Sequence, residues 1–182
     1  MGVFQQGWPT VYFDADGVVV PEVDRGPEYE RRFRARWTSA HTMKEFRVVG
    51  GVEDILAEIH ARKYRAIIIT NKPALEYGEM LPGVYAEMRR VLTSKGFDDI
   101  FTCPHRLDSN CSCRKPKPGL LLEAARKWNS PLKRSVFVGD RETDLMAAKA
   151  AGCTGVLLDT PRNKSVSALH RITALRQILS FL

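Results

Sequence analysis

The feature that most constrains the fold is an apolar segment, residues 11–20, that is interrupted by two aspartates. Val-Tyr-Phe leads into Asp14 and Asp16, and Gly17 with three valines leads out. The apolar run predicts a buried strand. Residues i and i+2 of a strand point to the same side, so the two carboxylates favour protonation of one or a bound cation. A strand that ends in an ordinary acidic turn is the alternative.

Further apolar segments alternate with helical patterns along the 182 residues. Strands are expected at 65–70, 99–102, 135–139 and 154–158, and helices at 52–63, 83–95, 119–128 and 143–151. This alternation predicts an α/β, Rossmann-like fold with a mainly parallel sheet in a single domain, 1–182. Ligands of such sheets bind beyond the carboxyl ends of the strands. The polar residues expected at those ends are Asp14, Asp16, Thr70, Asn71 and Asp140.

Two segments are less regular. Residues 21–48 are basic, with four arginines between 31 and 36, and three interpretations stay open: a solvated excursion, a flap over the site, or a basic surface for a partner. His41 in this segment is expected at the surface, and His60 is interpreted as structural. Residues 165–182 carry apolar residues at helical spacing, which predicts a C-terminal docking helix. A helix on a membrane surface is the alternative.

The charge balance bears on the ligand. With 28 basic and 21 acidic residues the formal net charge is +7, which suits an anionic ligand and equally suits nucleic acid. No apolar run approaches the roughly 18 residues of a membrane span. Residues 1–10 lack the pattern of a signal peptide, which predicts a cytoplasmic protein with no membrane partner. Nothing in the sequence indicates an obligate interface, so a monomer is expected.

Three cysteines and a histidine lie within one short segment: Cys103, His105, Cys111 and Cys113. Three thiolates and an imidazole are a tetrahedral ligand set for structural Zn²⁺, and four protein ligands leave no open position for catalysis. Unrelated cysteines beside a surface histidine are the alternative. Cys153 stands apart and is expected to be a buried apolar residue.

The segment runs directly into Arg114 and Lys115. A bound zinc would therefore fix the position of Lys115, with Arg114 directed at the same ligand. Lys115 would supply a positive charge, Thr70 a hydroxyl for phosphoryl oxygens, and the carboxylates of Asp14, Asp16 and Asp140 a hard oxygen site that suits Mg²⁺. Together these groups favour phosphoester hydrolysis.

The combination resembles the haloacid dehalogenase superfamily of phosphotransferases. Its four motifs are matched in order by Asp14-Ala-Asp-Gly-Val, Thr70, Lys115 and Gly139-Asp140-Arg-Glu-Thr-Asp144. The resemblance implies that Asp14 is the nucleophile of an aspartyl-phosphate mechanism and that Asp16 protonates the leaving group and then activates water. It also implies that Asp14, the backbone of Asp16 and Asp140 hold Mg²⁺ and that Asp144 supports them. An acid at position 16 favours a phosphatase over a dehalogenase.

The cysteine segment followed by Arg-Lys-Pro-x-Pro-Gly is similar to the histidinol-phosphatase-like branch, whose members have little or no cap domain. The branch includes phosphatases of D-glycero-D-manno-heptose 1,7-bisphosphate and of histidinol phosphate. The match implies that Asn71, Arg114 and Arg141 bind substrate. Val18, where the branch has threonine, and Lys72-Pro73-Ala74, where it has Gln-Ser-Gly, depart from the pattern. The expected substrate is a sugar bisphosphate; histidinol phosphate, a nucleic-acid 3′-phosphate and a binding module without turnover are the alternatives.

Overall fold

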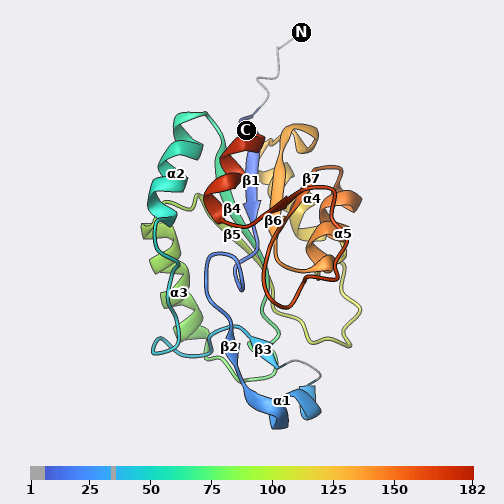
Figure 1. Cartoon of the computed structure of the whole chain (residues 1–182). Coiled ribbons are helices and arrows are strands. Elements are labelled where there is room, and N and C mark those ends of the chain that lie inside the picture. The colour runs from blue at the N-terminus through green and yellow to red at the C-terminus, as the bar shows by residue number, and fades with distance from the viewer. Residues whose placement is uncertain (1–6, 34–35) are drawn as a thin grey trace.

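The computed structural model describes residues 7–33 and 36–182 (Figure 1). Six parallel strands form one sheet in the order β5-β4-β1-β6-β7-β8. Their bounds are Thr10–Phe13 (β1), Arg65–Asn71 (β4), Asp99–Cys103 (β5), Val136–Gly139 (β6), Thr154–Leu158 (β7) and Arg171–Ile172 (β8). The expected α/β fold class is confirmed, and the four strands predicted after the first lie within one residue of their expected bounds.

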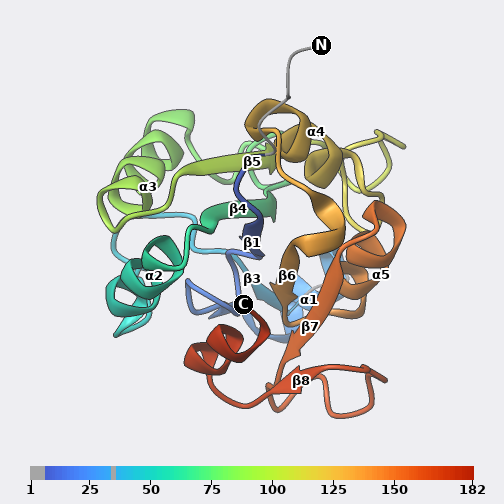
Figure 2. The ribbon, with the colours of Figure 1, turned by 90° about the horizontal axis from the view of Figure 1, so that it is seen from above.

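Helices cover both faces of the sheet (Figure 2). Helices α2 (Val52–Ala61) and α3 (Pro82–Ser94) lie on one face, and α4 (Gly119–Trp128) and α5 (Glu142–Ala151) lie on the other. The alternation of side chains along β1 supplies both cores, since Val11 and Phe13 belong to the first and Tyr12 to the second. A strand that is buried on both faces has to be continuously apolar, which explains the sequence of β1 and β4.

The basic segment contains regular structure, where the sequence suggested an irregular stretch. It forms β2 (Val23–Asp24), α1 (Gly26–Phe33) and β3 (Trp37–Thr38), and β2 pairs antiparallel with β3. We call the described residues of 21–48 the flap; it lies beyond the carboxyl ends of the central strands (Figure 1). Arg25 holds it together, because its guanidinium donates to Thr38 Oγ1 at 2.9 Å and to Ser39 O at 2.8 Å.

Glu45 completes this contact. Its carboxylate accepts two hydrogen bonds from Arg25, at 2.7 and 3.0 Å, and one from the backbone amide of His41 at 2.8 Å. The Arg25 guanidinium, together with the backbone amides of His41 and Thr42, lowers the pKa of Glu45 to about 2. A single arginine therefore ties β2 to the turn that follows β3.

The prediction of one long C-terminal helix is wrong. Residues 165–170 are not helical, Arg171–Ile172 forms β8 beside β7, and only Leu175–Phe181 (η2) is helical, as a 3-10 helix. The open edge of β7 offers backbone hydrogen bonds that a continuous helix would forgo. The apolar residues Ile172, Ile178 and Leu179 are nevertheless buried, whereas Leu169 is 92% exposed. Among the described residues, no helix is long and apolar enough to cross a bilayer.

Candidate active site

The acidic motif lies at the carboxyl end of β1, the central strand, between the loops that follow β4 and β6. The backbone amide of Asp14 donates to Val138 O at 2.9 Å, and the amide of Ala15 donates to Asp14 Oδ1 at 2.7 Å. Gly17 has a φ of +85°, and a Cβ there would stand 2.4 Å from Asp140 Oδ2. The glycine of the motif is thus required both by its backbone conformation and by the approach of Asp140.

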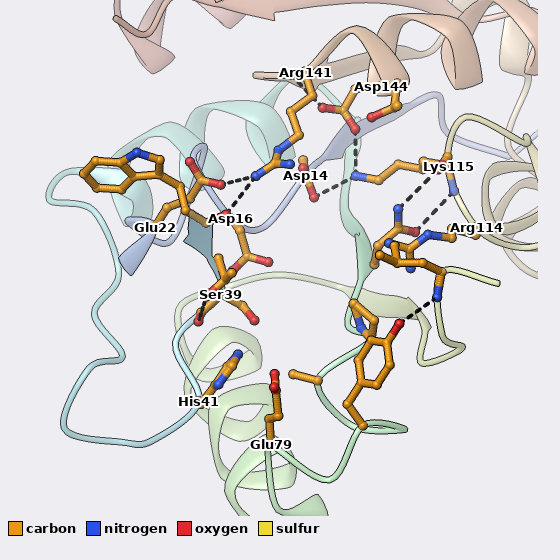
Figure 3. Close-up of a pocket in the computed structure, with 18 of the residues that line it drawn as sticks. Asp14, Asp16, Glu22, Ser39, His41, Glu79, Arg114, Lys115, Arg141 and Asp144 are labelled. Atoms are coloured by element: carbon orange, nitrogen blue, oxygen red, sulfur yellow. Dashed lines mark hydrogen bonds and ion pairs between the residues drawn. The ribbon is translucent and has the colours of Figure 1, made fainter. Parts of the chain in front are cut away.

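Lys115 is the cation at the centre of the site. Its ammonium lies 2.7 Å from Asp14 Oδ1, 2.7 Å from Asp144 Oδ1 and 3.1 Å from the carbonyl of Ile69 (Figure 3). Burial acts to lower the pKa of Lys115, but the two carboxylates outweigh it and raise the pKa above its usual value. The lysine is therefore held as an ammonium beside Asp14.

Asp140 and Asp144 complete a group of carboxylates with Asp14. One oxygen from each of the three lies within 4.8 Å of the others. Burial, with the charges of Asp14 and Glu22, raises the pKa of Asp140 to about 8, and its Oδ1 has no hydrogen-bond partner among the described residues. A buried, unpartnered carboxylate oxygen beside two others fits a divalent cation with oxygen ligands.

Asp144 also organises the start of α5. Its Oδ2 accepts a hydrogen bond of 3.0 Å from the backbone amide of Arg141, while its Oδ1 faces Lys115. Gly139 leaves room for this arrangement, because a Cβ there would lie 2.3 Å from Asp144 Cβ. The spacing from Gly139 to Asp144 in the sequence therefore reflects one compact turn between β6 and α5.

Asp16 faces Lys72. The Lys72 ammonium lies 2.7 Å from Asp16 Oδ1 and 2.5 Å from Oδ2, and only 5% of Lys72 is exposed. Burial raises the pKa of Asp16, and the charge of Lys72 opposes this effect. The sequence marked Lys72 only as a departure from a family pattern, so this ion pair was not foreseen. Its position directly after Thr70 and Asn71 was the available signal.

Thr70 and Asn71, which were also expected at the site, lie at the end of β4. Thr70 is buried at the end of β4, and its Oγ1 has no hydrogen-bond partner in the described part of the chain. The Asn71 amide brackets the backbone of Lys115: Oδ1 accepts from the Lys115 amide at 3.2 Å and Nδ2 donates to its carbonyl at 3.4 Å. Asn71 therefore positions Lys115 in addition to lining the cavity described below.

Two arginines expected to bind substrate lie at the cavity wall. Arg114 donates to the carbonyl of His105 at 3.2 Å. Arg141 pairs with Glu22, a carboxylate that also pairs with Arg162 and is only 1% exposed at its side chain. Arg162 in turn stacks over the Trp37 ring at 4.6 Å. Glu22 was not recognised in the sequence, and it joins the flap to both arginines.

Most of the residues described above line a cavity of about 390 Å³ (Figure 3). Its inner end is formed by Asp14, Asp16, Lys115 and Asp144, and its distal end by the flap and the loop after β4. The distal residues are Tyr29, Trp37, Thr38, Ser39, His41, Tyr77 and Glu79. His41, which was expected at the surface, is partly exposed and lies at the wall of this cavity, and burial lowers its pKa. No motif lies near His41 in the sequence, so the sequence did not indicate that it would lie at the cavity.

The cysteine segment converges as expected. One ligand atom from each of Cys103, His105, Cys111 and Cys113 lies within 4.8 Å of the others. His105 Nδ1 stands 3.2 Å from Cys113 Sγ, and Cys103 Sγ stands 3.5 Å from Cys111 Sγ. Ligand–ligand separations of this size fit a tetrahedral Zn²⁺ with thiolate and imidazole ligands.

The two remaining residues behave as expected. Cys153 is 9% exposed, and burial raises the pKa of its thiol to about 12, so it is an inert apolar side chain. His60 Nε2 lies 3.0 Å from Asp98 Oδ2 on the face of the sheet that α2 covers, remote from the catalytic edge. Neither residue belongs to the site.

The fold and the site together define a hydrolase of the haloacid dehalogenase (HAD) type. A family model described as HAD-hydrolase-like matches residues 112–176. The chain is 30% identical over 166 residues to the D-glycero-β-D-manno-heptose-1,7-bisphosphate 7-phosphatase of Vibrio cholerae, which covers 84% of this chain and 82% of the relative. The corresponding Yersinia pestis protein is 31% identical over 169 residues, covering 85% and 82%.

Solved structures agree. The heptose 1,7-bisphosphate phosphatase of Bordetella bronchiseptica, complexed with magnesium and phosphate, has a TM-score of 0.77 and 25% identity, covering 94% of this chain and 96% of that one. A HAD-like phosphatase of Mesorhizobium loti shares the fold, with a TM-score of 0.72 and 20% identity over 100% and 88% of the two chains. The chain belongs to the haloacid dehalogenase superfamily and is a phosphatase of the branch that its heptose-bisphosphatase relatives form.

Proposed function

We propose that the chain is a Mg²⁺-dependent phosphomonoester hydrolase that acts through an aspartyl-phosphate on a small phosphorylated sugar, with a D-glycero-D-manno-heptose 1,7-bisphosphate as the first candidate. The observation that carries the proposal is the convergence of Asp14, Asp140 and Asp144 beside Lys115, with Asp16 on the same cavity. On this proposal residues 1–182 act as one phosphatase domain, and the flap covers its cavity.

Asp14 is the nucleophile in this mechanism. Its Oδ1 is held by Lys115 and by the Ala15 amide, which leaves Oδ2 to attack phosphorus. A bond forms between that oxygen and phosphorus while the bond from phosphorus to the sugar oxygen breaks. Asp16 gives its proton to the departing alkoxide, which leaves as an alcohol. The hydroxyl of Thr70 and the ammonium of Lys115 bind the phosphoryl oxygens.

Hydrolysis of the aspartyl-phosphate completes the cycle. Asp16, now a carboxylate, takes a proton from a water molecule that attacks phosphorus, and the bond to Asp14 breaks to release inorganic phosphate. Asp14, Asp140 and the backbone of Asp16, with Asp144 behind them, would hold Mg²⁺, which would supply positive charge to neutralise the phosphoryl oxygens. Zn²⁺ on the four Cys and His ligands would fix the segment that carries Arg114 and Lys115.

The sugar bisphosphate is favoured by the relatives, since those at about 30% identity are named for heptose 1,7-bisphosphate. Arg114 and Arg141 lie at the cavity wall where a second phosphate would need cations. Histidinol phosphate is the second candidate, because Glu79 and three aromatic side chains line the distal end and would suit a cationic or aromatic leaving group. A nucleic-acid 3′-phosphate stays a third alternative, and a monomer in the cytoplasm stays a prediction.

A substrate panel tests the proposal. Release of inorganic phosphate is measured with Mg²⁺ from both anomers of the heptose bisphosphate, other sugar phosphates, histidinol phosphate and a 3′-phosphorylated oligonucleotide. We expect the heptose bisphosphate to have the highest kcat/KM and Asp14→Asn to abolish turnover while the protein stays folded. Preference for the oligonucleotide would overturn the metabolite assignment, and turnover by folded Asp14→Asn would overturn the nucleophile.

A further inference from the structure

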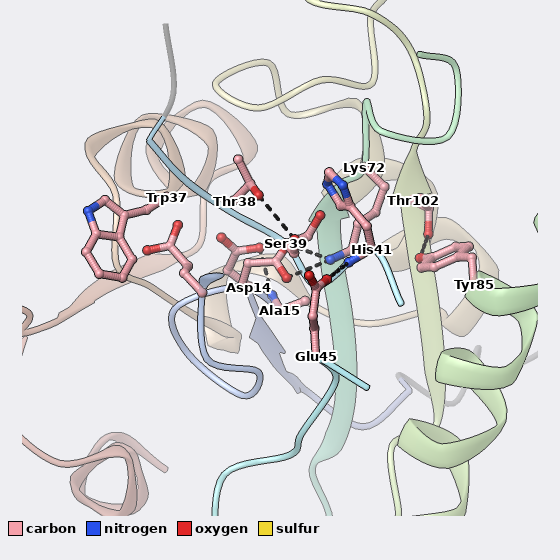
Figure 4. A network of polar contacts seen from close by, with 12 residues as sticks. Asp14, Ala15, Trp37, Thr38, Ser39, His41, Glu45, Lys72, Tyr85 and Thr102 are labelled. Carbon is pink, nitrogen blue, oxygen red and sulfur yellow. Dashed lines mark hydrogen bonds and ion pairs between the residues drawn. The ribbon is translucent and has the colours of Figure 1, made fainter. Parts of the chain in front are cut away.

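The ion pair between Lys72 and Asp16 is the part of the site that the mechanism above does not use. Both Asp16 oxygens lie within 2.7 Å of the Lys72 ammonium, and the side chains are only 6% and 13% exposed. Figure 4 shows Lys72 reaching from the end of β4 toward the acidic loop after β1. The contact spans 56 residues of sequence and joins the two central strands at their carboxyl ends.

Lys72 does not itself line the cavity, whereas Asp16 does. The lysine is anchored from behind, because its backbone amide donates to Cys103 O at 2.7 Å, next to the cysteine segment. Since Asp16 lines the cavity and Lys72 does not, the ammonium contacts the carboxylate from outside the cavity lining. A group in this place acts on the substrate only through Asp16.

We propose that Lys72 is a positioning residue that holds the Asp16 carboxylate in the orientation required for proton transfer to the leaving group. The inference rests on the proposed function, since it assigns Lys72 a task within that reaction. In the charged form both Asp16 oxygens accept from the ammonium, which fixes the position and the rotation of the carboxylate. When Asp16 carries the proton that it gives to the leaving group, one oxygen keeps the contact with Lys72 and the other holds the proton toward the cavity.

Lys72 restrains Asp16 through these two contacts, which hold the carboxylate at one side-chain rotation. With Met at position 72 neither contact can form, and we expect the carboxylate to move from this position. Proton transfer depends on hydrogen-bond distance to the leaving oxygen, so a small displacement of Asp16 slows the reaction.

Substrates with different leaving groups can distinguish a positioning role of Lys72 from a purely structural role. A sugar phosphate leaves as an alkoxide and requires the proton of Asp16, whereas p-nitrophenyl phosphate leaves as a stable phenolate and does not. The value of kcat/KM reports the reaction up to phosphoryl transfer to Asp14, so the later hydrolysis of the aspartyl-phosphate does not enter it. A loss of Lys72 should therefore affect the two substrates unequally.

The experiment compares Lys72→Met and Lys72→Gln with the unaltered chain, using p-nitrophenyl phosphate and the best sugar phosphate of the panel. We expect Lys72→Met to lower kcat/KM roughly 10- to 100-fold for the sugar phosphate, part of the full effect of a general acid, and less than about 3-fold for the aryl ester. Lys72→Gln, which keeps one donor, should fall between. Lys95→Met removes a partly exposed lysine outside the cavity and serves as the matched control.

The same Lys72 substitution in an Asp16→Asn variant tests whether the lysine acts through Asp16. In Asp16→Asn, a further Lys72→Met change should have no additional effect on sugar phosphate hydrolysis, because the lysine acts through the residue already removed. An equal loss for both substrates in folded Lys72→Met, or an undiminished effect in the Asp16→Asn background, would overturn the inference. If the unaltered chain hydrolyses neither ester, the proposed function fails instead.

Discussion

Lys115 contacts two carboxylates from different motifs at the same distance: its ammonium lies 2.7 Å from Asp14 and 2.7 Å from Asp144. All three side chains are less than a tenth exposed. One cation therefore orients the residue assigned as nucleophile and compensates the charge of Asp144, which lies in the first turn of α5. The segment that carries it is fixed by Asn71 on one side and by the cysteine cluster on the other.

Removal of that cation should cost both stability and activity. Lys115→Met leaves two buried carboxylates without their partner, and we expect the free energy of unfolding in metal-free buffer to fall by about 3–5 kcal/mol. Urea denaturation measures this. Adding Asp144→Asn should restore part of the stability but none of the phosphatase activity. An unchanged free energy of unfolding in the single variant would contradict the ion pairs described here.

The cysteine cluster should bind one metal ion and control Lys115. We expect metal analysis to find about one zinc per chain and Cys111→Ser to lose it. The loss should lower kcat, because Arg114 and Lys115 follow the cluster directly and Gly119 packs against Ser112, where a Cβ would stand 2.4 Å from the carbonyl oxygen.

Cys153→Ser is the matched control for this prediction, since the same change outside the cluster should leave the zinc content unaltered. Protein that is purified without zinc, and that is as active and as stable as zinc-loaded protein, would show that the four ligands serve no structural role.

Magnesium should stabilise the protein more at higher pH. The pKa of Asp140 is raised from its usual value to about 8, so without metal its contribution to stability is full at low pH and is lost as pH rises toward 8. Mg²⁺ competes with that proton and is bound better by the carboxylate. We therefore expect the increase in Tm on adding Mg²⁺ to grow between pH 6 and pH 8.

Asp140→Asn should weaken this dependence, because the amide neither titrates nor supplies a charged ligand. Thermal denaturation with and without Mg²⁺ at three pH values provides the measurement. A stabilisation by Mg²⁺ that is equal at pH 6 and pH 8 would contradict the assignment of Asp140 as a ligand.

We expect the flap to affect substrate binding more than the rate of the chemical step. Arg25→Met removes the guanidinium that joins β2 to Ser39 and Glu45, and Thr38 and Ser39 line the cavity. We expect KM for the preferred substrate to rise about 10-fold, equivalent to about 1.4 kcal/mol, with a smaller change in kcat. Arg90→Met, at a largely exposed arginine on α3, is the control. Equal KM values for Arg25→Met and the unaltered chain would show that the flap does not position substrate.

The local sequence was sufficient to predict a feature wherever the residues that form it lie on one element or within one short segment. The buried strands, the glycine beside Asp140, the acidic turn that starts α5 and the grouping of the four Cys and His side chains of the cysteine segment all follow from spacing within a few residues. The C-terminal segment shows the limit: its apolar residues are largely buried, as the pattern indicates, but the free edge of β7 changed a helix into a strand and a short 3-10 helix.

The sequence by itself determined the sheet, its catalytic edge and the class of chemistry, because strand and helix periodicity and the acidic motifs are encoded by near neighbours. Only the tertiary structure decided that Lys72 meets Asp16, that Glu22 joins two arginines and that His41 faces the cavity. These contacts join residues up to 140 positions apart. Charged and polar side chains of this kind carry no periodic pattern, and their partners are set by the packing of the loops that bring them together.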